Sequence, residues 1–188
     1  MPKPELTKKL IADALKKLSA HKHLDKISIS EIVDTAGLNR QTFYYHFQDK
    51  QELVCWIFDT DVISLADKTQ NAVLLSDIVG HLYSEKNFYI YALTSEVQNN
   101  LREHLFKYCY RRCTEELLII LGSRKADEKA LHMVAEFFTH AIVGSLVRWA
   151  QEGMKTDNKQ FVGDYGPFLK GQLVFSVNYY ADDSSDEN

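Results

Sequence analysis

A short run of polar and aromatic side chains between positions 40 and 46 carries hydrogen-bonding groups that suit the edges of DNA bases. Arg40 has the geometry to donate two hydrogen bonds to guanine, and Gln41 can bond adenine in the same bidentate way. Thr42 adds a hydroxyl group and a methyl group that fits thymine. The aromatic side chains farther along are long enough to donate to phosphate oxygens, which sets register without reading sequence. They are Tyr44, Tyr45 and His46.

Capping signals predict the helices that would present this run. Ser28 and Glu31 have the spacing of a capping box, which indicates a helix over about 29–36. Gly37 then suits the left-handed residue that ends a helix, and Asn39 is a good cap for the next one. Two short helices joined by such a turn are typical of a helix-turn-helix, whose second helix enters the major groove with its first residues.

Two residues outside the short helix are also placed to contact the DNA backbone. Ser30 lies early in the first helix of the pair, and Lys50 begins a fourth helix that Asp49 caps. The positive end of each helix dipole would favour a phosphate at these points. We expect the fourth helix to run to about Lys68, and we expect Phe43 to face the core.

Charge is unevenly distributed along the 188 residues. Residues 1–50 hold nine Lys or Arg against six Asp or Glu, a net charge of +3, whereas the other 138 residues carry −7. This asymmetry indicates a weakly basic DNA-reading part on an acidic body. Affinity for DNA grows with the number of phosphates neutralised, so two such parts acting together are expected.

The rest of the chain predicts helices only, and the predicted fold class is all-α. Apolar periodicity indicates helices over about 75–85, 87–94, 96–121, 127–153 and 159–180, the last kinked or restarted at Gly166-Pro167. We expect an N-terminal three-helix helix-turn-helix DNA-binding domain over 1–50, a larger C-terminal helical effector-binding and dimerisation domain over 51–180, and an acidic disordered tail over 181–188. No long apolar run or secretory signal is found, so a cytoplasmic protein with no membrane partner is expected. No cofactor motif is found, and no cofactor is expected.

The helix predicted over 127–153 is apolar on nearly every side. A helix without a polar face needs cover all round, and a second subunit is the simplest source of that cover. The residues predicted to form a homodimer interface are Ile142, Leu146, Trp149, Phe168 and Val177.

Aromatic residues are frequent in the second part of the chain. They would suit a pocket for a small apolar or aromatic effector, although aromatic residues at helical spacing more often pack a core. The candidate effector-binding residues are Tyr83, Phe88, Tyr91, Phe106, Tyr110, Phe137 and His140.

Three other groups of residues allow chemistry, each with a plainer alternative. His132 and His140, with His81 or His104 nearby, could hold a metal, but helical histidines more often make hydrogen bonds at the surface or in the core. Cys109 and Cys113 are better explained as small buried thiols than as a redox pair, and no metal site is predicted. The arginines of the same helix could bind an anionic effector, but a solvated face is the preferred interpretation. They are Arg102, Arg111 and Arg112.

Residues 6–53 resemble the DNA-binding domain of the TetR/AcrR family of regulators. The resemblance rests on the stretch from Gly37 to Phe47 and on Asp-Lys-Gln-Glu-Leu at 49–53. It implies an all-helical homodimer with an inducer-binding C-terminal domain, a double-stranded DNA operator as partner, and a set of DNA-contact positions. These positions are Ser30, Asn39, Arg40, Gln41, Thr42, Tyr44, Tyr45, His46 and Lys50. Asn39 replaces the more common Ser or Thr cap, and Arg40-Gln41 replace smaller residues, so no operator sequence is implied.

Three further stretches are similar to the DhaS-like subgroup of that family, whose regulators work with a protein coactivator. They are Arg40-Gln-Thr-Phe-Tyr44, Leu53-Val-Cys-Trp-Ile-Phe58 and Phe88-Tyr-Ile-Tyr91. Two modes of regulation therefore stay open. The default is a repressor that a small-molecule effector releases from a palindromic operator, because most relatives repress. The alternative is an activator whose body docks a protein coactivator. An enzyme built on helices is a third hypothesis, but no sequence motif favours it.

Overall fold

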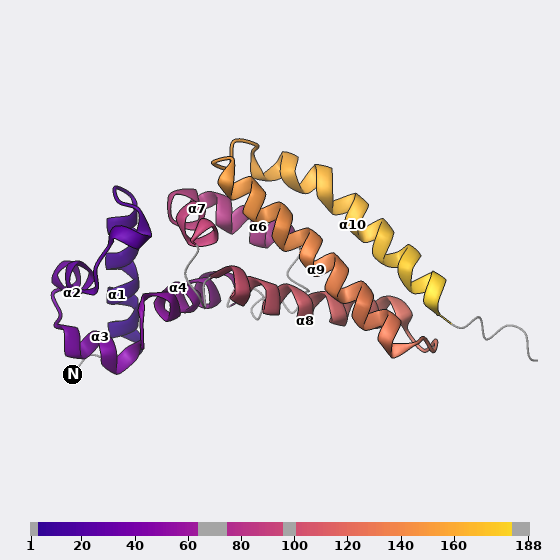
Figure 1. Cartoon of the computed structure of the whole chain (residues 1–188), viewed down its shortest axis with the longest axis horizontal. Coiled ribbons are helices and arrows are strands. Elements are labelled where there is room, and N and C mark those ends of the chain that lie inside the picture. Colours follow the sequence, from indigo (N-terminus) through magenta and orange to yellow (C-terminus); the bar gives the residue numbers. More distant parts are fainter. Residues whose placement is uncertain (1–3, 64–74, 96–100, 182–188) are drawn as a thin grey trace, which may run out of the picture.

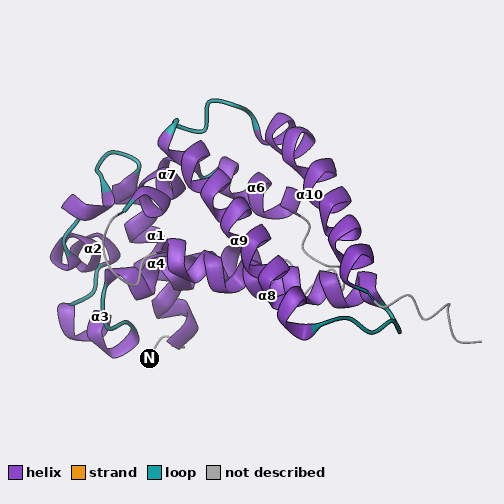
Figure 2. Ribbon diagram, turned by 45° about the vertical axis from the view of Figure 1, so that its right-hand side comes forward, coloured by secondary structure: helices purple, strands orange, loops and turns teal. Residues whose placement is uncertain are grey.

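The structure, a computed structural model, describes residues 4–63, 75–95 and 101–181, and nearly all of them are helical (Figure 1). Figure 2 draws no strand in these residues, where the single β-type contact is an isolated antiparallel bridge between Ala126 and Ala181. The prediction of an all-α fold is confirmed. In chain order the elements are α1 (Pro4–Ser19), the short 3-10 helix η1 (Leu24–Lys26), α2 (Ile29–Ala36), α3 (Arg40–His46), α4 (Lys50–Phe58), the π-helix η2 (Asp59–Ile63), α6 (Leu75–Ser84), α7 (Lys86–Thr94), α8 (Leu101–Leu121), α9 (Glu128–Gln151) and α10 (Asn158–Tyr180).

The first three α-helices, α1 to α3, pack round a small core and are called the head below (Figure 1). Ile11 and Leu15 from α1, Ile32 from α2 and Phe43 from α3 are fully buried. Each such side chain contributes about 1.5–3 kcal/mol of hydrophobic free energy when it leaves water. The head core therefore holds α3 against α1 and α2 and leaves its other side in solvent.

The helices α6 to α10 form the body. The long helix α8 runs away from the head, α9 returns beside it, and α10 runs away again (Figure 1). One hydrophobic cluster extends without a break from the head through Val54, Ile57 and Phe58 of α4 into the body, and a second cluster lies between α8, α9 and α10. The hydrophobic core continues across residue 50 and so marks no boundary there. The domain boundary predicted at residue 50 stays a prediction.

The apolar helix α9 is covered in part by helices of its own chain, whereas Met133 and Phe137, four residues apart, are 52 % and 68 % exposed. It packs against α7, α8 and α10, and Leu146, Trp149 and Ala150 are buried among them. Of the described helices, α9 alone has the length and mean hydropathy of a membrane span, and 44 % of that window is buried inside the protein. The covered sides of α9 therefore belong to the core of the body, and the side with Met133 and Phe137 is open to solvent.

Two helix predictions differ from the structure, and a third predicted limit lies outside the described residues. The α-helix that starts at Lys50 ends at Phe58 and continues as η2, and the rest of the stretch predicted to reach Lys68 lies outside the described residues. The helix α8 starts at Leu101, and residues 96–100 lie outside the described ones. No restart occurs at Gly166-Pro167, because α10 continues through Pro167 as one helix. The tail predicted to be disordered lies outside the described residues from 182 onward.

Candidate nucleic-acid interface

The helix α3 has one buried side and one exposed polar side. Phe43 and Phe47 are 0 % and 2 % exposed, which fixes the helix on the head core. Arg40 and Gln41 are exposed in its first turn, and Tyr45 is 80 % exposed one turn later. A short helix that presents its first-turn polar side chains to solvent has the arrangement of a recognition helix.

The turn before α3 is built from the caps that the sequence predicts. The Ser28 hydroxyl accepts the backbone N–H of Glu31 at 3.2 Å, and the Glu31 carboxylate accepts the Ser28 N–H at 2.9 Å. Gly37 has a φ of 68°, the left-handed conformation that a side chain would strain. The amide oxygen of Asn39 then accepts the N–H of Thr42 at 2.8 Å. These bonds set the angle between α2 and α3 and confirm the predicted helix-turn-helix.

The same bonds limit what two predicted contact residues can offer. The Thr42 hydroxyl donates to the Asn39 amide oxygen at 3.0 Å, so its hydrogen is already used inside the protein. Thr42 keeps its methyl group for a thymine, and Asn39 keeps its NH₂ group for a phosphate. Ser30 and His46 are half-buried, whereas Tyr44 is 50 % exposed.

Lys50 makes bonds that the sequence did not predict. Its ammonium group donates to the carbonyl oxygens of Leu24 and Ile27 at 2.5 and 2.8 Å. The side chain is half-buried, and burial lowers the pKa of Lys50 below its usual 10.5. Lys50 therefore ties the end of η1 to the start of α4, and a phosphate contact would require it to leave both carbonyls.

A further cation on the head is paired. Lys22 donates to Glu31 at 2.6 Å, and this bond, together with those from Ser28, lowers the pKa of Glu31 to about 2. Glu31 is thus ionised at neutral pH and caps α2 with a full negative charge, which suits the positive end of the helix dipole.

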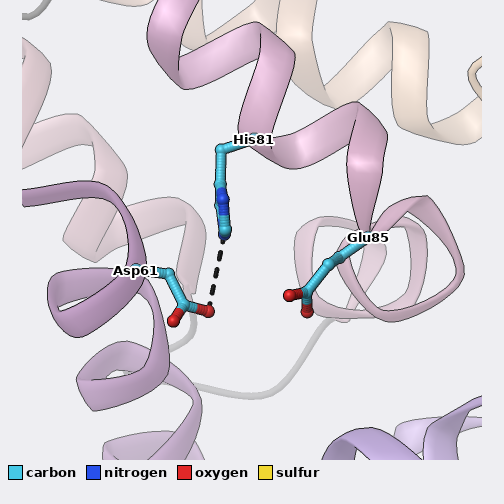
Figure 3. Close-up of side chains that lie close together, drawn as sticks. All are labelled: Asp61, His81 and Glu85. Atoms are coloured by element: carbon cyan, nitrogen blue, oxygen red, sulfur yellow. Dashed lines mark ion pairs between the residues drawn. The ribbon is translucent and has the colours of Figure 1, made fainter. Parts of the chain in front are cut away.

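Four charged or titratable side chains join the head to the body; we call them the Lys16 cluster. Lys16 of α1 donates to Asp61 of η2 at 2.5 Å and to Glu85, at the end of α6, at 2.9 Å. His81 of α6 points at Asp61 across 3.4 Å, as Figure 3 shows, and also lies 3.2 Å from the Tyr89 hydroxyl. The cluster therefore connects α1, η2 and α6 in one set of contacts.

Electrostatics favour the charged forms in the Lys16 cluster. Burial works to lower the pKa of Lys16, but the bonds and charges of Asp61 and Glu85 outweigh burial and raise it above 10.5. Burial likewise works to raise the pKa of Asp61, yet the hydrogen bonds from His81 and Lys16 hold it below 3.8. One ligand atom each from Asp61, His81 and Glu85 lie within 4.8 Å of one another, so a metal ion would fit only by displacing the ammonium group of Lys16.

The predicted effector residues do not surround one cavity. Phe88 is 3 % exposed and belongs to the core, and the Tyr83 ring stacks on Trp149 with centroids 5.9 Å apart. Tyr91 lies against His23 of the head, with ring centroids 4.3 Å apart. These three aromatic residues pack the core or the contact between head and body.

The other four candidates lie along α8 and α9. Phe106 and His140 meet at a centroid distance of 4.7 Å and line a surface groove. The Tyr110 hydroxyl is 2.8 Å from a ring nitrogen of His132, and Phe137 is 68 % exposed. The contacts of His132 and His140 are those of ordinary helical histidines. Among the described residues, neither belongs to a group of side chains that could hold a metal ion.

A larger cavity that the sequence analysis did not predict lies between α6, α8, α9 and α10. It has a volume of about 680 Å³. Cys109 and Cys113 lie in its wall, and burial raises the pKa of their thiols to about 12 and 11. Both thiols are therefore neutral at physiological pH, which agrees with the interpretation of small buried side chains.

Three of the five residues predicted to form a dimer interface are buried inside the protomer. Leu146 and Val177 are 0 % exposed and Trp149 is 3 % exposed, so they have no surface to offer a second copy. Ile142 is half-buried in the wall of the 680 Å³ cavity. Phe168 alone of the five is well exposed, at 62 %. On α9, Met133 and Phe137 remain 52 % and 68 % exposed. Which residues form the dimer interface stays a prediction.

Comparison with known proteins identifies the class. Residues 11–55 match the bacterial regulatory proteins of the tetR family, and residues 73–166 match a transcriptional regulator C-terminal region of the TetR type. The second match alone spans half of the chain, and the first covers the helix-turn-helix described above. The chain belongs to the TetR family of regulators.

Individual relatives support the same assignment. The chain is 38 % identical over 95 residues to the HTH-type dhaKLM operon transcriptional activator DhaS of Lactococcus lactis subsp. lactis (strain IL1403), an alignment that covers 47 % of this chain and spans about half the length of that relative. A solved structure of a dihydroxyacetone kinase operon activator DhaS superposes with a TM-score of 0.67 at 19 % identity, over 95 % of this chain and 99 % of that one. NalD, the secondary repressor of a multidrug efflux pump in Pseudomonas aeruginosa, superposes with a TM-score of 0.53 at 14 % identity, over 95 % of this chain and 99 % of that one. At these identities both structures show the shared fold.

Proposed function

We propose that this protein is a sequence-specific DNA-binding regulator of transcription. The observation that supports it most strongly is α3, whose exposed first turn holds Arg40 and Gln41 while Phe43 anchors the opposite side. In that position Arg40 and Gln41 would read base edges in the major groove. Tyr44 and Tyr45 would donate to phosphates and set the register.

A homodimer is part of the proposal, because one head carries few free positive charges. The helix α10 presents three aromatic side chains to solvent: Phe168, Phe175 and Tyr179, which are 62 %, 65 % and 72 % exposed. They are spaced seven and four residues apart and so share one face of the helix. Burying this face against the same face of a second copy would give a two-fold dimer, with two α3 helices about one turn of DNA apart, roughly 34 Å, or somewhat more.

The direction of regulation has two candidates. The relative that is 38 % identical over half the chain is named an operon activator, which favours activation by this protein. The body cavity of about 680 Å³ favours control by a small molecule, as expected for a repressor that an effector releases. A reporter gene with the operator placed either upstream of the promoter or across it separates the two directions. Either role would be carried out on DNA in the cytoplasm.

A selection of genomic fragments with the purified protein tests the DNA-binding role. The protein should enrich a palindromic site over random competitor, and the double substitution Arg40→Ala with Gln41→Ala should abolish the enrichment. Lys125→Ala removes the same charge in the loop between α8 and α9, at the end of the body far from the head (Figure 1), and should leave enrichment intact. Equal retention of all fragments by the unmodified protein would contradict the proposal.

A further inference from the structure

Two polar side-chain atoms, each from a residue that lines the 680 Å³ cavity, have no hydrogen-bond partner in the described structure. They are the Tyr108 hydroxyl and the Nε of Arg112, and both atoms are buried. Tyr108 as a whole is only 5 % exposed. Nearly all buried polar atoms in folded proteins are paired, since an unpaired one costs about 1–3 kcal/mol. Two unsatisfied donors on residues that line one cavity therefore indicate a missing acceptor.

Both donors lie on the same side of α8. Tyr108 and Arg112 are four residues apart, so their side chains project from one face of the helix. Arg112 also forms an ion pair with Glu115 through another guanidinium nitrogen, which leaves Nε for a second partner. Burial raises the pKa of the Tyr108 phenol, so the hydroxyl keeps its proton and can donate.

The charges near this part of the cavity add up to a site for one negative group. Arg112 of α8 and Lys170 of α10 lie in the wall, opposed there by Glu116. Arg111 places its guanidinium over the Tyr108 ring, 5.6 Å from the centroid, and Glu115 balances one positive charge. Counting these five side chains, positive groups exceed negative ones by one.

The rest of the wall is apolar. Ile78 of α6, Ile142 of α9 and Leu173 of α10 line it, together with the two neutral thiols already described. The α10 wall also contains Gly163, where a Cβ would meet no heavy atom within 4 Å. The space is that of a drug-sized ligand with a predominantly apolar body.

We propose that this cavity binds an apolar small molecule that carries one carboxylate, held by the Tyr108 hydroxyl and the Arg112 guanidinium. The apolar part of the ligand lies between α6 and α10. The carboxylate accepts both unpaired donors once the two side chains turn toward it, because neither polar atom has accessible surface in the free protein. This inference rests on the proposed regulatory function only for its biological meaning, because binding itself requires no DNA.

The cavity is connected to the head by α6 and α4. Ile78 in the cavity wall lies three residues before His81, which contacts Asp61 in the Lys16 cluster. Tyr108 packs edge-on against Phe58, the last residue of α4, with centroids 5.8 Å apart. A ligand that changes the spacing of α6 and α8 would therefore act on both connections to the head. By linkage, DNA and ligand would then change each other's affinity by the same factor.

Titration calorimetry with the full chain tests the ligand class. The probes are hexanoate, octanoate, decanoate, dodecanoate and 2-naphthoate, each paired with the alcohol of the same skeleton. At least one carboxylate should bind saturably and its alcohol about tenfold or more weakly, as expected when a charge-assisted hydrogen bond is lost. Failure of every carboxylate to bind, or equal binding of acid and alcohol, would overturn the proposal.

Two substitutions separate a binding role from a structural one. Tyr108→Phe removes a hydroxyl that is unpaired in the free protein, so thermal stability should stay equal or rise while carboxylate affinity falls severalfold. Arg112→Met should lower affinity about tenfold or more. If Tyr108→Phe instead lowers stability and leaves affinity unchanged, the hydroxyl has a structural partner and the assignment is wrong.

A cavity-filling substitution with a matched control locates the site. Gly163→Leu places a side chain into the 680 Å³ cavity and should abolish carboxylate binding. Gly144→Leu is the control, because Gly144 lines the separate groove beside Phe106 and His140 and also has no heavy atom within 4 Å of an added Cβ. Loss of binding in Gly144→Leu alone would move the site to that groove and refute the proposal. Operator selection is measured separately, so a failure of DNA binding does not obscure either result.

Discussion

Replacing Lys16 by Met should weaken the contact between head and body, and the structure gives the size of the effect. Lys16 is the positive partner of Asp61 and Glu85, at 2.5 and 2.8 Å. Without its ammonium group, two carboxylates face each other with oxygens up to 4.8 Å apart. At an effective dielectric constant of about 20, this repulsion is about 3.5 kcal/mol at the full separation of 4.8 Å. Because Asp61 and Glu85 are 23 % and 35 % exposed, solvent screening reduces the expected loss to about 1–3 kcal/mol.

Thermal unfolding followed by circular dichroism measures this loss. For a chain of this length, a loss of about 2 kcal/mol lowers Tm by about 4–8 °C. Lys17→Met is the matched control, because Lys17 is exposed on the same helix and should cost about 0.5 kcal/mol or less. Adding Glu85→Gln to Lys16→Met removes one of the two facing charges and should recover much of the lost stability.

The pH dependence gives a second, independent signature. In the unmodified protein, the raised pKa of Lys16 means that its contribution is complete below pH 10.5 and is lost above the folded pKa. The lowered pKa of Asp61 means that its contribution is complete above its unfolded pKa of about 4 and is lost in more acidic solution. Stability from the Lys16 cluster should therefore be nearly constant between about pH 5 and 10.

The Lys16→Met variant should behave in the opposite way at acidic pH. The two facing carboxylates raise each other's pKa, so the folded variant binds a proton more readily than the unfolded chain. The stability deficit of the variant should then shrink as pH falls from 7 toward 5. A deficit no larger than that of Lys17→Met, or one that grows as pH falls, would refute the assigned role of the cluster.

Three other substitutions test the head and the proposed dimer. Arg40→Ala should cost about 1–3 kcal/mol of operator binding and relax selectivity at one base pair; unchanged selectivity in a binding-site library would show that Arg40 reads no base. Lys50→Met should lower the free energy of unfolding by about 1–3 kcal/mol, because the Ile27 carbonyl loses the Lys50 donor and the Leu24 carbonyl keeps only the backbone N–H of Ile27. An unchanged unfolding midpoint, combined with a flatter salt dependence of DNA binding, would instead assign Lys50 to a phosphate. Phe175→Glu should give monomers in sedimentation velocity while Leu118→Glu on α8, also exposed, stays dimeric, and the reverse pattern would place the interface on α8.

The local structure of the head could be predicted from sequence because its signals are local. The capping box of Ser28 and Glu31 and the positive φ of Gly37 each depend on residues within a few positions. The direction of the Lys50 side chain could not be predicted in the same way. Its acceptors lie 23 and 26 residues earlier in the chain, and a lysine in the first turn of a helix fits a phosphate contact equally well.

The cavity and the Lys16 cluster depend on contacts distant in sequence. Lys16 meets partners 45 and 69 residues away, and periodicity along one helix says nothing about such pairs. The apolar residues of α9 showed that the helix must be covered, but not which helices cover it. Arg112 illustrates the same limit: its position on α8 favours a solvated face, whereas the burial of its Nε is evident only in the folded structure.

The π-helix η2 gives this protein a way to change a side-chain direction without unfolding a helix. A π-turn holds one more residue than an α-turn, so a shift of the hydrogen-bond pattern toward α-type bonding would rotate the residues within it about the helix axis. Asp59 bonds His104 of α8 at 2.5 Å, and Asp61, two residues on, bonds Lys16 of α1. A slip of register in this single turn would release both carboxylates at once. A deletion of one residue between 59 and 63 would mimic that slipped state permanently.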